Sequence, residues 1–210
     1  MRMNEKPDQL SGVQIYCNCL EEVKQRIETV QAIVNRRVAI DGFGNKRFLN
    51  EFLCIQIRNI LELVAFGSMS SNIALYQREF KKYRRDWNAK TILDNLEKIN
   101  PYFYPEPMKQ ASVSIGGQAA LEVVTEGFLT KSEFIFLYNA CSKVIHSPNP
   151  FSNEGELDFK RTIDDWMHRI ASLLWFHQMT LIEEDCSWFV YLVHPETKRS
   201  HAIKTVPKEN

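Results

Sequence analysis

Apolar residues recur at intervals of three and four along residues 10–34. This spacing places them on one face of a helix and therefore predicts a long amphipathic helix. Ser11 and Gln14 fit a capping box, so the helix is expected to begin near Asp8 or Ser11. The segment DGFGNK (41–46) carries two glycines and an asparagine, which predict a turn. The first helix would then contain about 30 residues.

A second helix is predicted over about 46–67, and it is apolar nearly all round. Such a helix belongs at the centre of a bundle. Its polar residues Glu51, Arg58 and Glu62 fall within about 40° of one another on a helical wheel, and Asn59 lies nearby. Because burying an unpaired charge is costly, this stripe must face solvent, a cleft or a partner. Either Arg58 and Glu62 pair one turn apart, or the stripe lines a cleft in which Arg58 binds a phosphate group.

Periodicity predicts four more helices, over about 71–83, 88–99, 130–146 and 158–181. Thr130 and Glu133 form a second capping box, and the apolar stripe of the last helix extends to His177. Prolines and a Gly116–Gly117 pair interrupt the segment from 101 to 129, so a long loop with at most a small hairpin is expected there. Near the C-terminus, two β-rich runs flank a polar turn and predict a hairpin.

These elements predict an all-α fold, a bundle of about five to six helices with a small β-hairpin at the C-terminus. The 210 residues are enough for one sizeable core. The bundle would occupy residues 1–185, including an irregular, β-like insertion at about 101–129. The hairpin would occupy 186–210 and pack on the bundle.

Charge and composition narrow the function only slightly. The 26 basic and 26 acidic residues cancel, so any attraction to nucleic acid must come from a local patch. No apolar run follows the N-terminal charges, and no stretch approaches the roughly 18 apolar residues of a membrane span, so a cytoplasmic protein without a membrane segment is expected. The five cysteines would be reduced thiols. Because the cysteine and histidine spacings fit no metal site, neither a metal nor a cofactor is predicted.

The stretch YNACSKVIHSPNPF (138–151) ends a predicted helix at His146, because two prolines follow. Asn139, Lys143 and His146 lie within about 60° of one another, opposite the apolar face of this helix. In one interpretation, His146 is a cation that satisfies the last carbonyl groups, where the helix dipole favours positive charge. In the other, an imidazole and an ammonium group converge on a phosphate.

The segment REFKKYRRDW (78–87) has five basic residues within eight positions. Phe80, Tyr83 and Trp87 are interleaved with them. Cations that meet phosphates and rings that stack on bases are typical of single-stranded nucleic-acid binding. The aromatic spacing of three and four is equally typical of a stripe that faces the core and leaves the basic residues in solvent. Both interpretations remain open.

Two of these segments, QIRNILELVAFGS (56–68) and the helix that ends at His146, resemble the HEPN superfamily. The resemblance covers about residues 8–181 and implies a helical bundle that pairs as a homodimer. Many members are metal-independent endoribonucleases of toxin–antitoxin and anti-phage systems, and others are non-catalytic binding or scaffold domains. Catalytic members carry an arginine four to six residues before a histidine. Here His146 matches that histidine, but positions 140–142 hold no arginine and are followed by Lys143.

The resemblance leaves two functions open, and the first is an RNA- or nucleotide-binding domain. As an enzyme, this domain would be a metal-independent endoribonuclease, in which His146 moves a proton of the ribose 2′-OH while Lys143 and Arg58 stabilise charge on the phosphate. In the second, it is a non-catalytic helical module for dimerisation or protein interaction. The implied partners are RNA or a nucleotide, a second copy of the chain, and a cognate antitoxin or other protein. Substrate contacts are assigned to Asn139, Glu62, Asn59, Arg78, Lys82 and Arg85.

Overall fold

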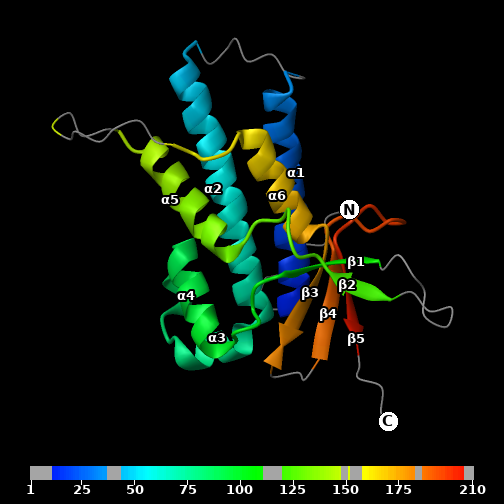
Figure 1. Cartoon of the computed structure of the whole chain (residues 1–210). Helices are drawn as coiled ribbons and strands as arrows, with labels where there is room; N and C mark the ends of the chain where they lie inside the picture. Colours follow the sequence, from blue (N-terminus) through cyan, green and yellow to red (C-terminus); the bar gives the residue numbers. More distant parts are fainter. Residues whose placement is uncertain are drawn as a thin grey trace, which may run out of the picture.

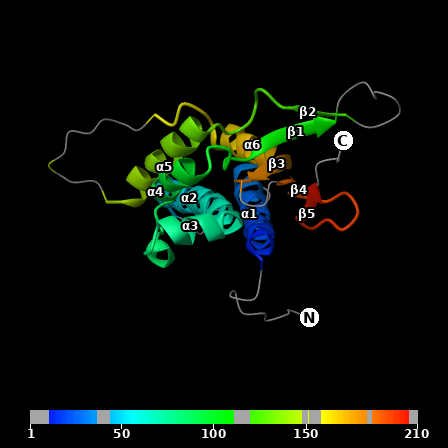
Figure 2. The ribbon, with the colours of Figure 1, turned by 90° about the horizontal axis from the view of Figure 1, so that it is seen from below.

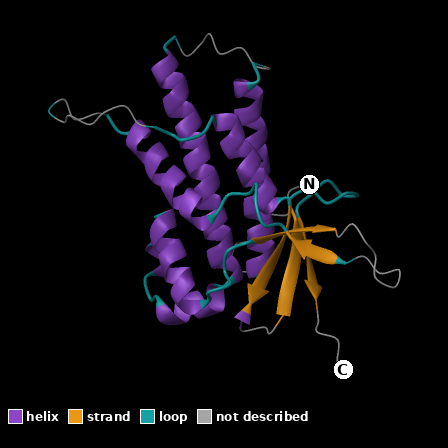
Figure 3. Cartoon of the chain, in the orientation of Figure 1, coloured by secondary structure: helices purple, strands orange, loops and turns teal. Residues whose placement is uncertain are grey.

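The structure is a computed structural model that describes residues 11–36, 44–110, 120–147, 151, 158–182 and 186–205 (Figure 1). Its helices are α1 (Gly12–Val34), α2 (Lys46–Ser71), α3 (Ile73–Glu79), α4 (Ala89–Ile99), α5 (Lys131–Ile145) and α6 (Ile163–Leu174). Its strands are β1 (Glu106–Gln110), β2 (Leu121–Val123), β3 (Phe176–Leu181), β4 (Cys186–Tyr191) and β5 (His201–Thr205). The strands gather on one side of the helices (Figure 3).

Side-chain caps set several helix ends as predicted. Ser11 forms both hydrogen bonds of the capping box at the start of α1, which spans 23 residues and is shorter than expected. Thr130 forms the same motif at the start of α5, and His146 directly follows the last residue of that helix. The turn predicted at 41–46 lies partly outside the described residues, and the Asn45 side chain caps α2. Local sequence therefore determines where these helices begin.

The prediction of one helix over 158–181 is wrong beyond Leu174. α6 ends there, and the following segment forms β3. His177 fits the helical stripe of the sequence because it lies seven residues after Ile170, but burial along β3 alternates with a period of two. Pairing with β1 and β4 favours the strand, and a helical wheel of one segment contains no information on such pairing.

The helix predicted over 71–83 is also shorter than expected. α2 continues to Ser71, α3 ends at Glu79, and a 3₁₀ turn follows at Tyr83–Arg85. The basic segment is thus divided between a helix end and a turn. Its side chains do not share one helical face, because each change of backbone conformation redirects them.

Five antiparallel strands form a sheet in the order β2-β1-β3-β4-β5. β4 and β5 are the predicted C-terminal hairpin, whereas β1 and β2 belong to the insertion predicted at 101–129. The Gly116–Gly117 pair of that insertion lies outside the described residues. Because β1 pairs with β3, the insertion and the hairpin become parts of one sheet. The prediction of a mostly helical chain is confirmed, but the all-α class holds only in part.

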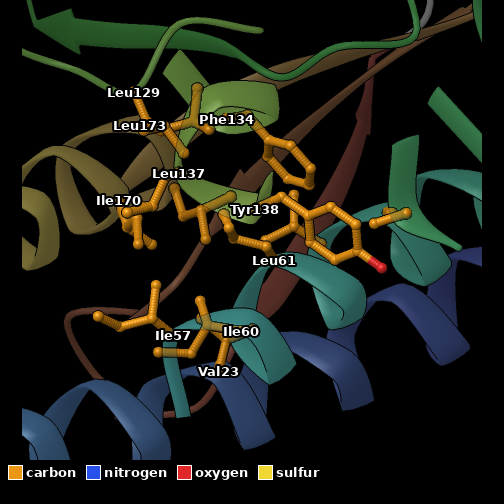
Figure 4. Close-up of a cluster of buried hydrophobic side chains, with 14 of the residues drawn as sticks. Val23, Ile57, Ile60, Leu61, Leu129, Phe134, Leu137, Tyr138, Ile170 and Leu173 are labelled. Carbon is orange, nitrogen blue, oxygen red and sulfur yellow. The ribbon is translucent and has the colours of Figure 1, made fainter. Parts of the chain in front are cut away.

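α2 lies at the centre of the helical part, in contact with α1, α4 and α5, as its apolar sequence predicts. Figure 4 shows Ile57 and Ile60 of α2 in a buried cluster with Leu137 of α5 and Ile170 of α6. The sheet packs beside α1 and α6, on the side away from α3, α4 and α5 (Figure 2). One hydrophobic core therefore extends from the helices to the sheet.

Among the described helices, α2 is the one long and apolar enough to cross a membrane, judged by length and composition alone. Half of its most apolar 18-residue stretch is buried within the fold. The core helix of a soluble protein meets the same criterion, because it too is apolar on several sides. The expectation that the chain has no membrane segment therefore stays a prediction.

A buried polar pair joins α1 to β3. The Tyr16 hydroxyl donates to His177 Nε2 over 2.7 Å, and His177 Nδ1 donates to the carbonyl oxygen of Leu174 over 3.0 Å. The carbonyl can only accept, so the hydrogen-bond network assigns the ring proton to Nδ1. Gly67 permits the close approach of α1 and α2 here, because a Cβ at that position would lie 2.7 Å from Tyr16 Cδ2.

Candidate functional site

An open hollow lies between the N-terminal end of α2 and the C-terminal end of α5, which meet at the same end of this helix pair (Figure 1). Its volume is ≈ 490 Å³. The lining residues are Lys46, Arg47, Asn50, Glu51, Lys143, Val144 and His146. Two of the predicted catalytic residues, Lys143 and His146, therefore share one surface.

The lining of this hollow has a net positive charge. Lys46, Arg47 and Lys143 are exposed cations, and Glu51 is the one carboxylate among the lining residues. Arg47 Nε donates to Glu51 Oε1 over 2.8 Å, so this pair is neutral and the net charge comes from the two lysines. The first backbone N–H groups of α2 add partial positive charge at the same place. An anion is therefore attracted to the hollow.

His146 is exposed at the end of α5, on the wall of the hollow. Among the described residues, the His146 ring forms no hydrogen bond with a carbonyl group of α5. Its ring is thus accessible to a bound ligand, with Lys143 one turn before it on the same helix.

Arg58 and Glu62 lie in a separate cluster between α2 and α5. Arg58 Nε donates to Glu62 Oε1 over 3.0 Å, and the other two guanidinium nitrogens donate to the Tyr138 hydroxyl, over 2.7 Å, and to Ser142 Oγ. The guanidinium carbon lies 4.4 Å from the centre of the Tyr138 ring. Burial raises the pKa of Tyr138, although the nearby Arg58 charge opposes this effect, and its hydroxyl donates to Glu62 Oε1 over 3.2 Å.

This cluster satisfies Arg58 internally. The Arg58 side chain is 14% exposed and that of Glu62 is 20% exposed, and neither lines the hollow. Of the two interpretations of this stripe, the pairing of Arg58 with Glu62 is observed. To bind a phosphate, Arg58 would have to leave Tyr138 and Ser142. Two more of the predicted contacts are also outside the hollow: Asn139 is exposed on α5, and Asn59 is half-buried on α2.

Arg78, Lys82 and Arg85 are exposed in the segment that follows the C-terminal end of α2. α2 has 26 residues. At a rise of about 1.5 Å per residue it is roughly 40 Å long. α3 and α4 lie at its far end, whereas the hollow lies at its start (Figure 1). The predicted substrate contacts therefore fall in separate places on the molecule.

The aromatic residues of this basic segment have different surroundings. Phe80 and Tyr83 are partly buried against the core, and the Phe80 ring lies 4.8 Å from that of Tyr76. Trp87, in contrast, is 65% exposed. The interpretation as a stripe that faces the core thus holds for Phe80 and Tyr83 but not for Trp87.

Sequence reasoning missed Lys46 and Arg47 in the hollow and Tyr138 and Ser142 around Arg58. Tyr138 and Ser142 are one helical turn apart, so their spacing alone could have predicted that they share one side of the helix. No local signal places the start of α2 beside the end of α5, because this contact depends on how the helices pack.

Among the described residues, no group of three His, Cys, Asp or Glu side chains is placed to hold a metal ion. No known protein family matches the chain, and no curated protein or solved structure matches it either. The class of protein is therefore defined by its own fold, a mostly helical domain with an antiparallel sheet. The resemblance to the HEPN superfamily stays a prediction.

Proposed function

We propose that this protein is an RNA-binding domain with a HEPN-like bundle, and that the hollow between α2 and α5 binds a phosphate group of the RNA. One observation carries the proposal: Lys143 and His146 share an open, net positive hollow with Lys46 and Arg47. Cations on two helices can contact different oxygens of one phosphate, and the N-terminus of α2 favours the same anion.

The same residues suit metal-independent cleavage of RNA, as in the toxin and defence nucleases of that superfamily. The ribose 2′-OH attacks the adjacent phosphate, and His146 takes the hydroxyl proton. The P–O5′ bond breaks, which leaves a 2′,3′-cyclic phosphate, and the departing 5′ oxygen takes a proton from water. Lys143 and Lys46 stabilise the charge that accumulates on the phosphoryl oxygens. Arg58 contributes by holding α5 against α2 through Tyr138, and not by touching the phosphate.

The basic segment after α3 supports RNA over a free nucleotide. Trp87 exposes most of its ring, on which a base can stack, and Lys82 and Arg85 are exposed nearby in the sequence. Because this segment and the hollow lie near opposite ends of α2, a ligand that contacts both must be a chain of several nucleotides. A mononucleotide would occupy the hollow alone.

The test is incubation of the purified protein with end-labelled total RNA in EDTA, beside variants. His146→Ala and Lys143→Gln remove the proposed groups, and His168→Ala is the matched control because His168 is an exposed histidine on α6. Expected are fragments with cyclic-phosphate ends from the native protein and His168→Ala, and a loss of at least about 100-fold in His146→Ala.

If no protein cleaves, filter binding of the same RNA separates binding from catalysis. Weaker binding by the Lys46→Gln/Lys143→Gln double variant supports the phosphate site without cleavage. Equal RNA binding by this variant and the native protein contradicts the proposed function.

A second candidate function, a dimerisation module, rests on the outer face of α2. Phe48 is 55% and Ile55 is 41% exposed, one above the other on this helix. Half-buried Phe66, five turns after Phe48, continues the same side. A second copy of the chain could cover this stripe. Sedimentation equilibrium tests it: a dimer that the Phe48→Ser/Ile55→Ser double variant converts to monomer supports this function, and a native monomer contradicts it.

A further inference from the structure

Two cysteines face each other across the contact between α2 and α5. Cys54 and Cys141 are 3% and 0% exposed, and each thiol influences the pKa of the other, so the two side chains are neighbours. The register of the helices holds them together, because Arg58, one turn after Cys54, bonds to Tyr138, one turn before Cys141. The thiol pair is therefore a fixed feature of the helix contact.

The pair lies next to the hollow. Glu51 precedes Cys54 by one turn on α2, and Val144 follows Cys141 by one turn on α5. Both Glu51 and Val144 line the hollow. Any covalent change at the two sulfurs thus acts on the same helix ends that form the proposed phosphate site.

The two thiols have different chemical tendencies. The neighbouring Cys141 thiol lowers the pKa of Cys54, while the Cys54 thiol and burial raise the pKa of Cys141. A thiolate is the reactive form of cysteine towards peroxides and disulfides. Cys54 is therefore the nucleophile of the pair, and Cys141 is the thiol that reacts second, with the oxidised Cys54.

We propose that Cys54 and Cys141 form a disulfide bond when the protein reacts with hydrogen peroxide or a related small peroxide. The Cys54 thiol first loses its proton, and the thiolate attacks one peroxide oxygen. The O–O bond breaks, and the departing hydroxide combines with the released proton to form water. Cys54 is then a sulfenic acid. The Cys141 sulfur attacks the Cys54 sulfur, the S–S bond forms, the S–O bond breaks, and the leaving hydroxide takes the Cys141 proton as a second water.

Two other cysteines provide an internal comparison. Cys17 and Cys19 lie two residues apart on α1, so they point to different sides of that helix. Burial, together with nearby carboxylates, raises the pKa of each to about 11. They are more exposed than Cys54 and Cys141 but lack a facing thiol partner in the described part of the chain.

The experiment is treatment of the native protein with limiting hydrogen peroxide, alkylation of free thiols, and tryptic peptide mapping without reduction. Cys54 lies in the peptide 48–58 and Cys141 in the peptide 132–143, each with a single cysteine. We expect a cross-link between these peptides, lighter by two hydrogens than their sum, in the native protein and in Cys17→Ser/Cys19→Ser. Oxidised glutathione is expected to react more slowly, because it is too bulky to reach buried sulfurs.

A second measurement follows thermal unfolding. The disulfide closes a long loop, so oxidation should raise Tm, and dithiothreitol should reverse the shift. Cys141→Ala should show no such shift. Free thiols in both peptides after Cys17 and Cys19 have reacted, or separate sulfinic acids at Cys54 and Cys141, would overturn the proposal. It does not depend on RNA binding, so its outcome and that of the RNA test are independent.

Discussion

Two histidines lie just beyond the last turn of a helix, and their surroundings differ in nearly every respect. His146 follows α5 and is exposed on the wall of a positively charged hollow. His177 follows α6 and is fully buried, with one ring nitrogen bonded to Tyr16 and the other to the carbonyl of Leu174. The role first considered for His146, satisfying a carbonyl at a helix end, is thus performed by His177.

A position at the end of a helix therefore does not define what a histidine does. Burial lowers the pKa of His177 to about 4, so its ring is neutral near neutral pH and both nitrogens are occupied. Such a ring stabilises the fold but cannot exchange protons with a ligand. Only an accessible ring such as that of His146 can do so. Three predictions test this contrast.

The largest effect is expected from His177→Ala. The substitution leaves a cavity and a buried Tyr16 hydroxyl without its acceptor, and together these should lower the free energy of unfolding by about 4 kcal/mol. His146→Ala, at an exposed position, should change it by less than about 0.5 kcal/mol. Urea unfolding near neutral pH measures both. Similar values for the two variants would show that the contrast between the histidines does not extend to stability.

A smaller effect is expected from acidification. The unfolded chain binds a proton at His177 with a pKa near 6.5, whereas the folded chain does so only near 4. Between these values the unfolded state holds more protons, so the free energy of unfolding falls as the pH decreases through this window, by about 3 kcal/mol in total. The contribution of His177 is complete above the window and lost below it.

Urea unfolding at a series of pH values measures this dependence. His177→Gln, which has no titratable ring, should lose less stability over the same window, whereas His146→Ala should behave like the native protein. If His177→Gln and the native protein have parallel pH profiles, the acid sensitivity arises elsewhere.

The smallest effect is expected from Tyr16→Phe. This change removes one hydroxyl and leaves His177 Nε2 buried without a donor, at a cost of about 1 to 2 kcal/mol. Tyr104→Phe is a suitable control, because the Tyr104 hydroxyl donates to the carbonyl of Leu129 and its loss removes a comparable bond that does not involve a histidine. The Tyr16 hydroxyl donates to the neutral ring, so its loss should also raise the pKa of His177 in the folded state. Tyr16→Phe, but not Tyr104→Phe, should therefore narrow the pH window over which stability is lost. Equal pH profiles for the two variants would contradict the proposed coupling of Tyr16 to His177.

The sequence was sufficient for features that depend on neighbours along the chain. The capping boxes at Ser11 and Thr130, the central position of α2 and the end of α5 at His146 all follow from local spacing. The pairing of Arg58 with Glu62 is of this kind too, because the two residues are one turn apart.

Features that depend on distant contacts could not be predicted in this way. β3 continues the helical stripe of α6 in sequence but pairs with β1 and β4 in the fold. Lys46 lines the same hollow as Lys143 only because α2 and α5 pack together. Trp87 fits an apolar stripe by its spacing in the sequence, yet the 3₁₀ turn at Tyr83–Arg85 precedes it and leaves its side chain in solvent.

The sheet has a consequence for how the chain folds. β1 lies near the middle of the chain, yet one of its partners, β3, begins only at Phe176, after β2, α5 and α6. During synthesis, this edge of β1 stays unpaired until the last part of the chain has left the ribosome, and unpaired edges promote aggregation. Closing this long-range pair should be the slow step of folding, after the contact of α1 with α2 has formed. A chain truncated before β3 would therefore retain its helices but expose an open strand.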